Sequence, residues 1–188
     1  MNRRLGQTGL GEKIEMRKQK GFSLIELLIV VAIILIIAAI AIPNLLRARM
    51  AANESSAAAS IRTVTTGQVT YQTAYPTVGY SPNLLDLGGA LGVACVPAST
   101  SACLIDSVLS NNGNPAATGK SGYSFTSGAG TKVGTVSIGY TILAKPLAMN
   151  QTGIKAFCAE EDAVLRVDLA GACSNTEAGI LGFNPLNN

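Results

Sequence analysis

Residues 20–49 read KGFSLIELLIVVAIILIIAAIAIPNLLRAR, and this stretch decides the fold. Within it, Leu27–Leu46 is a run of 20 residues without a charged side chain. At about 1.5 Å per residue, such a helix crosses the roughly 30 Å hydrocarbon core of a bilayer. Six Lys and Arg side chains precede the run in residues 1–21, and only Arg47 and Arg49 follow it closely. The sequence therefore predicts a single-pass membrane helix with a cytoplasmic N-terminus.

The composition of the 188-residue chain excludes several classes of protein. It has no histidine, which removes Ser-His-Asp and Cys-His catalysis and histidine zinc sites. The net charge of +3 comes from residues 1–21, which carry six basic and two acidic side chains. The remaining 8 basic and 9 acidic side chains sum to −1, so no nucleic-acid-binding surface is indicated. We expect neither an enzyme nor a cofactor or metal site.

Glu26 lies at the cytoplasmic start of the apolar run. A charged side chain deep in a membrane costs about 2.5–3.5 kcal/mol, so Glu26 is either hydrated at the headgroup level or paired with a cation. The stretch offers no basic partner, but cleavage before Phe22 would create a positive α-amine. A secretory signal peptide fits poorly, because its apolar region has about 7–15 residues and ends at a small-residue cleavage site.

The residues KGFSLIE at 20–26 and the apolar run behind them resemble the N-terminus of type IV pilins and of type II secretion pseudopilins. Gly21, Phe22, Glu26 and Pro43 all stand at the family's spacing. The resemblance implies that a prepilin peptidase cuts after Gly21 and N-methylates Phe22. It further implies that Glu26 acts in subunit assembly and that Pro43 lies inside the helix, where it should produce a kink.

The resemblance implies a structural subunit of a type IV pilus, of the type IVa-like major pilin kind. Such a subunit waits in the bacterial inner membrane and is polymerised into an extracellular filament. Its partners would be membrane lipid, identical subunits, the peptidase and an assembly machinery driven by a separate ATPase. Two alternatives remain open: a pseudopilin of a secretion system, and a membrane-anchored adhesin that uses the same processing signal. The sequence leaves open whether the filament serves adhesion, twitching motility, DNA uptake or electron transfer.

The leader is the point at which the chain departs from the family. Cleavage after Gly21 makes residues 1–21 the leader, although family leaders are usually shorter. A start at Met16 would give the six-residue leader MRKQKG. Residues 1–15 carry no apolar period, and we expect them to be disordered.

The helix is predicted to continue from Phe22 to about Tyr75. Residues 22–50 form its transmembrane and assembly half, and residues 51–188 form the head. In the second half, residues spaced alternately four and three apart form one stripe along the helix: Ala57, Ile61, Val64, Gln68, Tyr71 and Tyr75. This spacing predicts that the second half packs on the head's own sheet. Pro76 ends the helix.

The rest of the head predicts an α+β fold, with a long helix against four antiparallel strands. Residues 76–120 are rich in Gly, Pro, Ser and Asn and suggest an irregular connection with one or two short helices. Period-two patterns within 121–170 predict the strands, and residues 171–188 are predicted to be a loop. The strand candidates are 123–125, 136–142, 156–158 and 164–169.

Four cysteines, Cys95, Cys103, Cys158 and Cys173, allow three pairings. Disulfides are the default in an exported chain, and pairing of sequence neighbours gives 95–103 and 158–173. The second pair resembles the C-terminal disulfide loop of type IV pilins. Four-thiolate metal binding is the alternative, but no C-x₂-C spacing supports it.

Three further patterns have ordinary explanations. Residues 113–121, GNPAATGKS, have one residue too many between the glycines for a phosphate loop, and we interpret them as a surface loop. Asn53 and Asn150 begin sequons that are common by chance. Glu160–Asp162 is an acidic run that suggests either a solvated turn or a calcium site.

Overall fold

A computed structural model describes residues 21–111, 119–169, 173 and 184–186. The chain divides into two units, the first ending at Ala41 and the second beginning at Ile42. From here on the name head means this second unit, which begins at Ile42 and not at the predicted residue 51. It contains all the strands and the C-terminal part of the long helix.

The helix α1 runs from Leu24 to Ala74 and confirms the predicted long N-terminal helix. Leucine, isoleucine and alanine make up much of its first half, and alanine is the best helix former. The helix continues through Pro43, which lacks the backbone N–H that would bond one turn back. It ends where Tyr75 precedes Pro76, because the residue before a proline is disfavoured in the helical region.

One stripe of α1 in the head is buried, as its spacing predicts. Its side chains are at most 1% exposed (Ala57, Ile61, Val64, Gln68, Tyr71), and Tyr75 packs against the core at its end. Gln68 is the polar member of the stripe. Its Nε2 donates to the Ser81 carbonyl and its Oε1 accepts from the Ser81 N–H, both at 2.9 Å. The buried amide is thereby satisfied, and it fixes the chain beyond Pro76 against the helix.

The main sheet has five antiparallel strands in the order β1-β4-β5-β6-β7. They are β1 (Tyr123–Ala129), β4 (Tyr140–Pro146), β5 (Ala156–Glu160), β6 (Arg166–Asp168) and β7 (Asn184–Pro185). The predicted α+β class with a four-stranded antiparallel sheet is confirmed, and β7 adds a two-residue edge strand that the sequence did not reveal. The rest of the C-terminal loop predicted at 171–188 lies outside the described residues, apart from Cys173 and Leu186.

The predicted strand 136–142 is wrong in its extent. β3 (Val136–Ser137) pairs with β2 (Lys132–Val133) in a separate small ladder, and β4 begins only at Tyr140 and continues to Pro146. Residues 140–144 are all buried, because β4 lies inside the sheet and both of its faces are covered. Such a strand lacks the apolar alternation on which the prediction relied. Ile138, which kept the alternation going, lies between the strands and is exposed.

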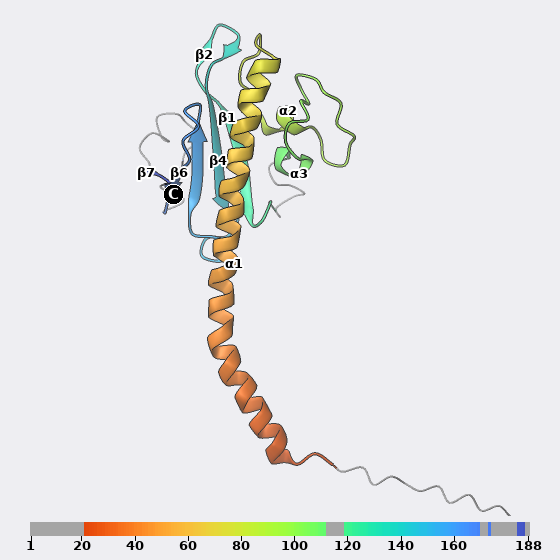
Figure 1. Cartoon of the computed structure of the whole chain (residues 1–188), viewed down its shortest axis with the longest axis vertical. Helices are drawn as coiled ribbons and strands as arrows, with labels where there is room; N and C mark the ends of the chain where they lie inside the picture. Colours follow the sequence, from red (N-terminus) through yellow and green to blue (C-terminus); the bar gives the residue numbers. More distant parts are fainter. Residues whose placement is uncertain (1–20, 112–118, 170–172, 174–183, 187–188) are drawn as a thin grey trace, which may run out of the picture. The chain divides into compact units, whose positions relative to one another are not determined.

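The sheet has a buried cluster on each face. The larger core lies between the sheet and α1, with Tyr123, Phe125, Tyr140 and Phe157 among its members. The smaller cluster, on the opposite face, contains Leu143, Ala156, Cys158 and Cys173. The cross-strand neighbours Leu143 and Cys158 thus share the second face. In Figure 1 the strands β6 and β7 lie to the left of α1 in the head.

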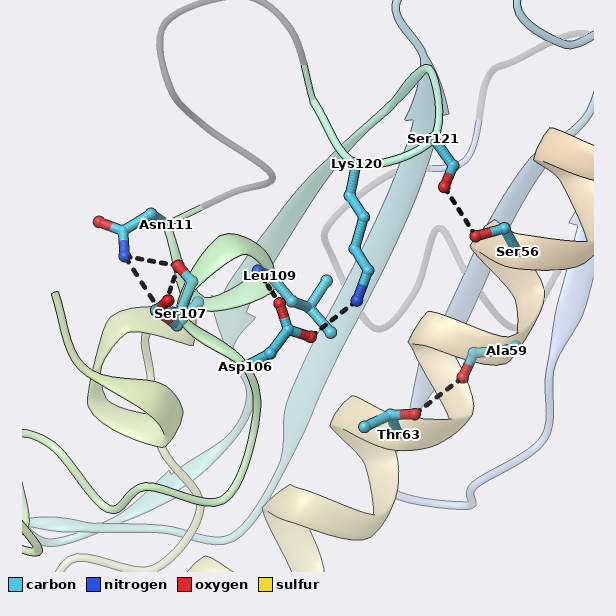
Figure 2. A network of polar contacts seen from close by, with 10 residues as sticks. Ser56, Ala59, Thr63, Asp106, Ser107, Leu109, Asn111, Lys120 and Ser121 are labelled. Atoms are coloured by element: carbon cyan, nitrogen blue, oxygen red, sulfur yellow. Dashed lines mark hydrogen bonds and ion pairs between the residues drawn. The ribbon is translucent and has the colours of Figure 1, made fainter. Parts of the chain in front are cut away.

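The connection after α1 contains two short helices, α2 (Leu84–Gly88) and α3 (Ser107–Ser110), as predicted. Both lie to the right of α1 in Figure 1. Asp106 caps α3, since its Oδ1 accepts from the Leu109 N–H at 2.9 Å, and its Oδ2 lies 2.7 Å from Lys120 Nζ (Figure 2). Burial alone would raise the pKa of Asp106, but the Lys120 and Leu109 hydrogen bonds hold it below its usual value.

Candidate processing and assembly segment

The first half of α1 is a helix without a covering in its own chain. From Leu24 to Leu46 every side chain is exposed except that of Ala38, which is partly buried. The large apolar side chains of this stretch are 45–78% exposed. By length and composition α1 is the one helix in the described part of the chain that could cross a membrane. So much apolar surface requires a non-aqueous environment outside the subunit.

Glu26 has a partner at the start of α1 that the sequence interpretation missed. Its Oε2 accepts the backbone N–H of Ser23 at 3.0 Å, while the Ser23 carbonyl accepts from the Leu27 N–H at 3.2 Å. This is one half of a capping box, in which a Glu three residues into the helix bonds back to the N-cap residue. The spacing Ser23-Leu24-Ile25-Glu26 is the S-x-x-E signal that could have revealed it.

The other predicted processing residues lie around this helix start or within α1. Gly21 has no heavy atom within 4 Å of the position that a Cβ would take, so the space around it is open. Phe22 is exposed. Pro43 lies inside α1. The sequence before Gly21 lies outside the described residues.

The structure contains two disulfides, both in the head. Cys95 and Cys103 join within the connection after α1, and their Cα atoms are 5.8 Å apart. Cys158, on β5, joins Cys173 with a Cα–Cα distance of 6.2 Å, and both side chains are fully buried. The predicted Cys158–Cys173 bridge is confirmed. It ties the chain that follows β6 to the second face of the sheet.

Arg166 pairs with the first and the last residue of the acidic run Glu160–Asp162. Arg166 donates to Asp162 Oδ1 at 3.1 Å, and its Nη1 lies 3.4 Å from Glu160 Oε1. The hydrogen bond to Asp162 raises the pKa of Arg166, and the reverse contact holds the pKa of Asp162 down against the effect of its burial. Among the described residues no group of three or more acidic or cysteine side chains could hold a metal ion. Two of the three carboxylates of the run are thus engaged by Arg166.

The remaining sequence patterns are structural. Asn53 Nδ2 donates to the Thr152 carbonyl at 2.9 Å, and the Thr152 hydroxyl bonds to the backbone of Ala148. The first sequon asparagine and the last residue of the second sequon therefore hold a loop against α1. Most of the predicted surface loop at 113–121 lies outside the described residues.

Comparison with known proteins identifies the class to which the N-terminal region belongs. Residues 16–42 match the family model described as the prokaryotic N-terminal methylation motif. This match covers the helix start described above, with Gly21, Phe22 and Glu26 inside it. The chain thus carries the N-terminal methylation motif of prokaryotic pilins.

The chain is also similar to a protein described as a pilus component. The chain is 54% identical over 57 residues to the type IV wide pilus major component PilA4 of Thermus thermophilus. The aligned part is 30% of this chain and 44% of that protein, so the chain spans less than half the length of this relative. No solved structure matches the chain. The resemblance to type IV pilins is confirmed for the N-terminal region.

Proposed function

We propose that this protein is a structural subunit of a type IV pilus, stored in a membrane by the first half of α1 and polymerised through the same segment. One observation carries the proposal: an exposed apolar helix of membrane-spanning length lies in a chain that has the pilin methylation motif at its start. The relative named as a pilus component favours a pilus over the secretion-system alternative.

The proposed mechanism depends on moving the apolar half of α1 between two apolar environments. Lipid surrounds it before assembly, and the corresponding helices of neighbouring subunits surround it afterwards. This exchange gains little hydrophobic free energy because lipid tails are as apolar as the side chains. Packing and specific polar contacts must therefore fix the register of the subunits, and a separate ATPase must supply the work of assembly.

Processing would prepare the polar contact. Cleavage between Gly21 and Phe22 and methylation of the new amine place a cation four residues before Glu26. In the filament we propose that the Glu26 carboxylate pairs with the Phe22 amine of an adjacent subunit. In the stored subunit the Ser23 N–H satisfies the same carboxylate, which explains how a charge is tolerated at the edge of the apolar run.

The processing step is tested by the substitution Gly21→Val. Open space surrounds Gly21 in this chain, so the variant should fold. The β-branched side chain should instead block the peptidase site and leave an uncut, membrane-retained precursor. Intact mass of the purified wild-type protein decides the position of the cut, and an N-terminus anywhere other than Phe22 contradicts the proposal.

The role of Glu26 is tested by comparing Glu26→Gln with Glu26→Ala. Glutamine keeps the capping bond to Ser23 but removes the charge, whereas alanine removes both. If pairing matters, both variants should be cleaved and membrane-resident but make few fibres, because breaking one side of a buried pair costs about 3–5 kcal/mol.

Cleavage, methylation, membrane content and surface fibre are scored separately for each variant. If Glu26→Gln makes normal fibres and Glu26→Ala makes none, then Glu26 acts only by capping the helix, and the proposed pairing is wrong. A fall in cleavage would assign Glu26 to recognition by the peptidase instead.

A further inference from the structure

The base of the head carries a loop that is held firmly against α1. This basal loop, residues 147–155, connects β4 to β5. The Asn53 side chain donates to the Thr152 carbonyl, and Glu54 Oε1 accepts the Ile154 N–H at 3.0 Å and the Lys155 N–H at 3.3 Å. The loop is therefore fixed to the helix by three hydrogen bonds.

The loop is also packed from within. A Cβ on Gly153 would lie 2.1 Å from the hydroxyl oxygen of Tyr123, so only glycine fits beside that ring. The Leu147 N–H donates to the Gly122 carbonyl at 2.9 Å. These contacts constrain the loop and hence the positions of the side chains that it exposes.

Three of those exposed side chains are large and apolar. Leu147, Met149 and Ile154 are each 40–42% exposed, although they lie within eight residues of one another on a fixed loop. Three such side chains in one loop give that loop apolar groups with which it can meet an apolar environment.

The loop reaches the level of α1 at which the apolar run ends. A hollow of about 500 Å³ is lined by Leu46 and Arg49 on the helix and by Gln151 and Thr152 on the loop, with Asn53, Ser121 and Gly122 completing it. Leu46 is the last residue of the uncharged run, and Asn53 lies about 10 Å further along the helix axis. A headgroup layer is about 5–8 Å thick on each side of a bilayer, so it would occupy this same interval.

The charged residue among those that line the hollow is the basic Arg49. Arg47 and Arg49 are exposed, and neither lies within ion-pair distance of a carboxylate in the part of the chain that the structure describes. Lys155 Nζ, by contrast, is already 3.3 Å from Glu54 Oε2. Arg49 and Gln151 both line the hollow, and their side chains carry N–H donors of the kind that bind phosphate oxygens.

From these observations we infer that the base of the head is a membrane-contact surface for anionic phospholipid. Arg49 and the hollow meet the phosphate of a headgroup, while the exposed apolar side chains of the basal loop enter the interface between headgroups and acyl chains. The inference rests on the proposed membrane storage of the subunit. It adds that the lipid binds the head as well as the helix, so the stored subunit is held at a defined depth.

The absence of tryptophan from the chain gives a direct test. The full-length Met149→Trp variant is reconstituted into vesicles of phosphatidylcholine with or without phosphatidylglycerol, and brominated lipids serve as the quencher. Leu147→Trp is a second reporter in case the first variant folds poorly. Val133→Trp is the matched control, because Val133 is exposed on the β2–β3 ladder rather than on the basal loop.

Brominated lipid should quench the two basal-loop reporters strongly in phosphatidylglycerol vesicles, less in pure phosphatidylcholine, and Val133→Trp hardly at all. Adding Arg49→Gln should reduce the quenching in phosphatidylglycerol vesicles to the level seen in phosphatidylcholine. Arg62→Gln, which neutralises an exposed arginine further along α1, should change nothing.

Flotation of the vesicles separates the two proposals. One outcome is that the chain floats with the vesicles while brominated lipid quenches Met149→Trp and Leu147→Trp no more than Val133→Trp. That result overturns the inference but leaves the proposed membrane storage intact. A chain that does not float overturns both. Emission that depends on the ratio of protein to lipid, and not on bromination, would assign the surface to a second copy of the chain and also overturn the inference.

Discussion

Between Leu24 and Leu46 the helix α1 has large apolar side chains on every side, whereas between Ala57 and Tyr71 only one stripe is buried. The two stretches share a backbone conformation and differ in what surrounds them. The second stretch finds its apolar partner in the sheet of its own chain. The first has apolar residues in too many directions for any one face of the head to cover. A helix with one apolar stripe can complete the core of its own chain, whereas a helix that is apolar on all sides needs an external partner. The distribution of apolar residues around the helix therefore matters more than their total number.

The outward face of α1 from Ala57 to its end at Ala74 supports this comparison. It carries four threonines whose hydroxyls each donate to the carbonyl four residues earlier, at 2.9–3.1 Å (Thr63, Thr66, Thr70, Thr73). Figure 2 shows this bond between Thr63 and Ala59. The side chains of this face are therefore polar but satisfied locally, and the face can remain in water.

The largest difference in the stability of the head should come from making the same Ile→Ala substitution in each half of α1. Ile61 is fully buried in the head and Ile34 is exposed. Ile61→Ala should destabilise the head by about 2–5 kcal/mol, because it removes buried methyl groups and leaves a cavity. Ile34→Ala should leave the stability of the head unchanged.

Denaturant unfolding of the full chain in detergent measures this contrast. All five tyrosines lie in the head, so near-ultraviolet circular dichroism of tyrosine reports on the head alone. Equal effects of Ile61→Ala and Ile34→Ala would show that the apolar half also contributes to the core of the head.

The disulfides should have the next largest effect, again confined to the head. The Cys158–Cys173 bridge closes a loop of 16 residues, and removing both cysteines should cost about 3 kcal/mol. The Cys95–Cys103 bridge closes a shorter loop and its cysteines are exposed, so its removal should cost less.

Double alanine variants of each pair test this order, and non-reducing peptide mapping of the wild type tests the pairing itself. A peptide that links Cys95 to Cys158 or Cys173 would refute the pairing. In both double variants the helical signal of the apolar half in detergent should persist, because that half contains no cysteine.

The smallest effect should come from the ion pair between Lys120 and Asp106. The pair is partly exposed, so Lys120→Met should cost less than about 1 kcal/mol at neutral pH. Because the folded-state pKa of Asp106 lies below its usual value, the unfolded chain binds the proton first as the pH falls. The stabilisation is therefore complete above about pH 4–5 and is lost on further acidification through the folded-state pKa.

Unfolding of wild type and Lys120→Met at neutral and acidic pH measures this loss. The difference between them should shrink on acidification. Lys132→Met is the matched control, since Lys132 is exposed on β2 and has no ion pair among the described residues. A difference that grows on acidification would contradict the assigned role of Asp106.

The sequence could predict those parts of the molecule that depend on local periodicity. The helix from about residue 22 to 75, its buried stripe and its end before Pro76 follow from spacing and from proline chemistry. The strands were harder to place. Residues 140–144 are buried on both faces and show no alternation, so the pattern gave β4 the wrong beginning and end.

The candidate site was predictable to a similar degree. Gly21, Phe22 and Glu26 are predicted from the resemblance to the pilin motif, which is readable because it lies in one continuous stretch. The capping bond of Glu26 was missed although its S-x-x-E signal is also local. The pairing of Arg166 with the acidic turn was not foreseeable, because it depends on the path of the chain between β5 and β6.

By itself the sequence determined that this protein has a membrane-length apolar helix behind a pilin-like processing motif, and that an α+β head follows. These features depend on the order of neighbouring residues, which the sequence contains in full. Only the tertiary structure decided which polar groups meet across the fold: Gln68 with Ser81, Asn53 with Thr152, and Arg166 with Glu160. Such contacts join separate elements whose approach depends on the turns between them and on the packing of the whole core, so the residue pattern of neither element specifies them.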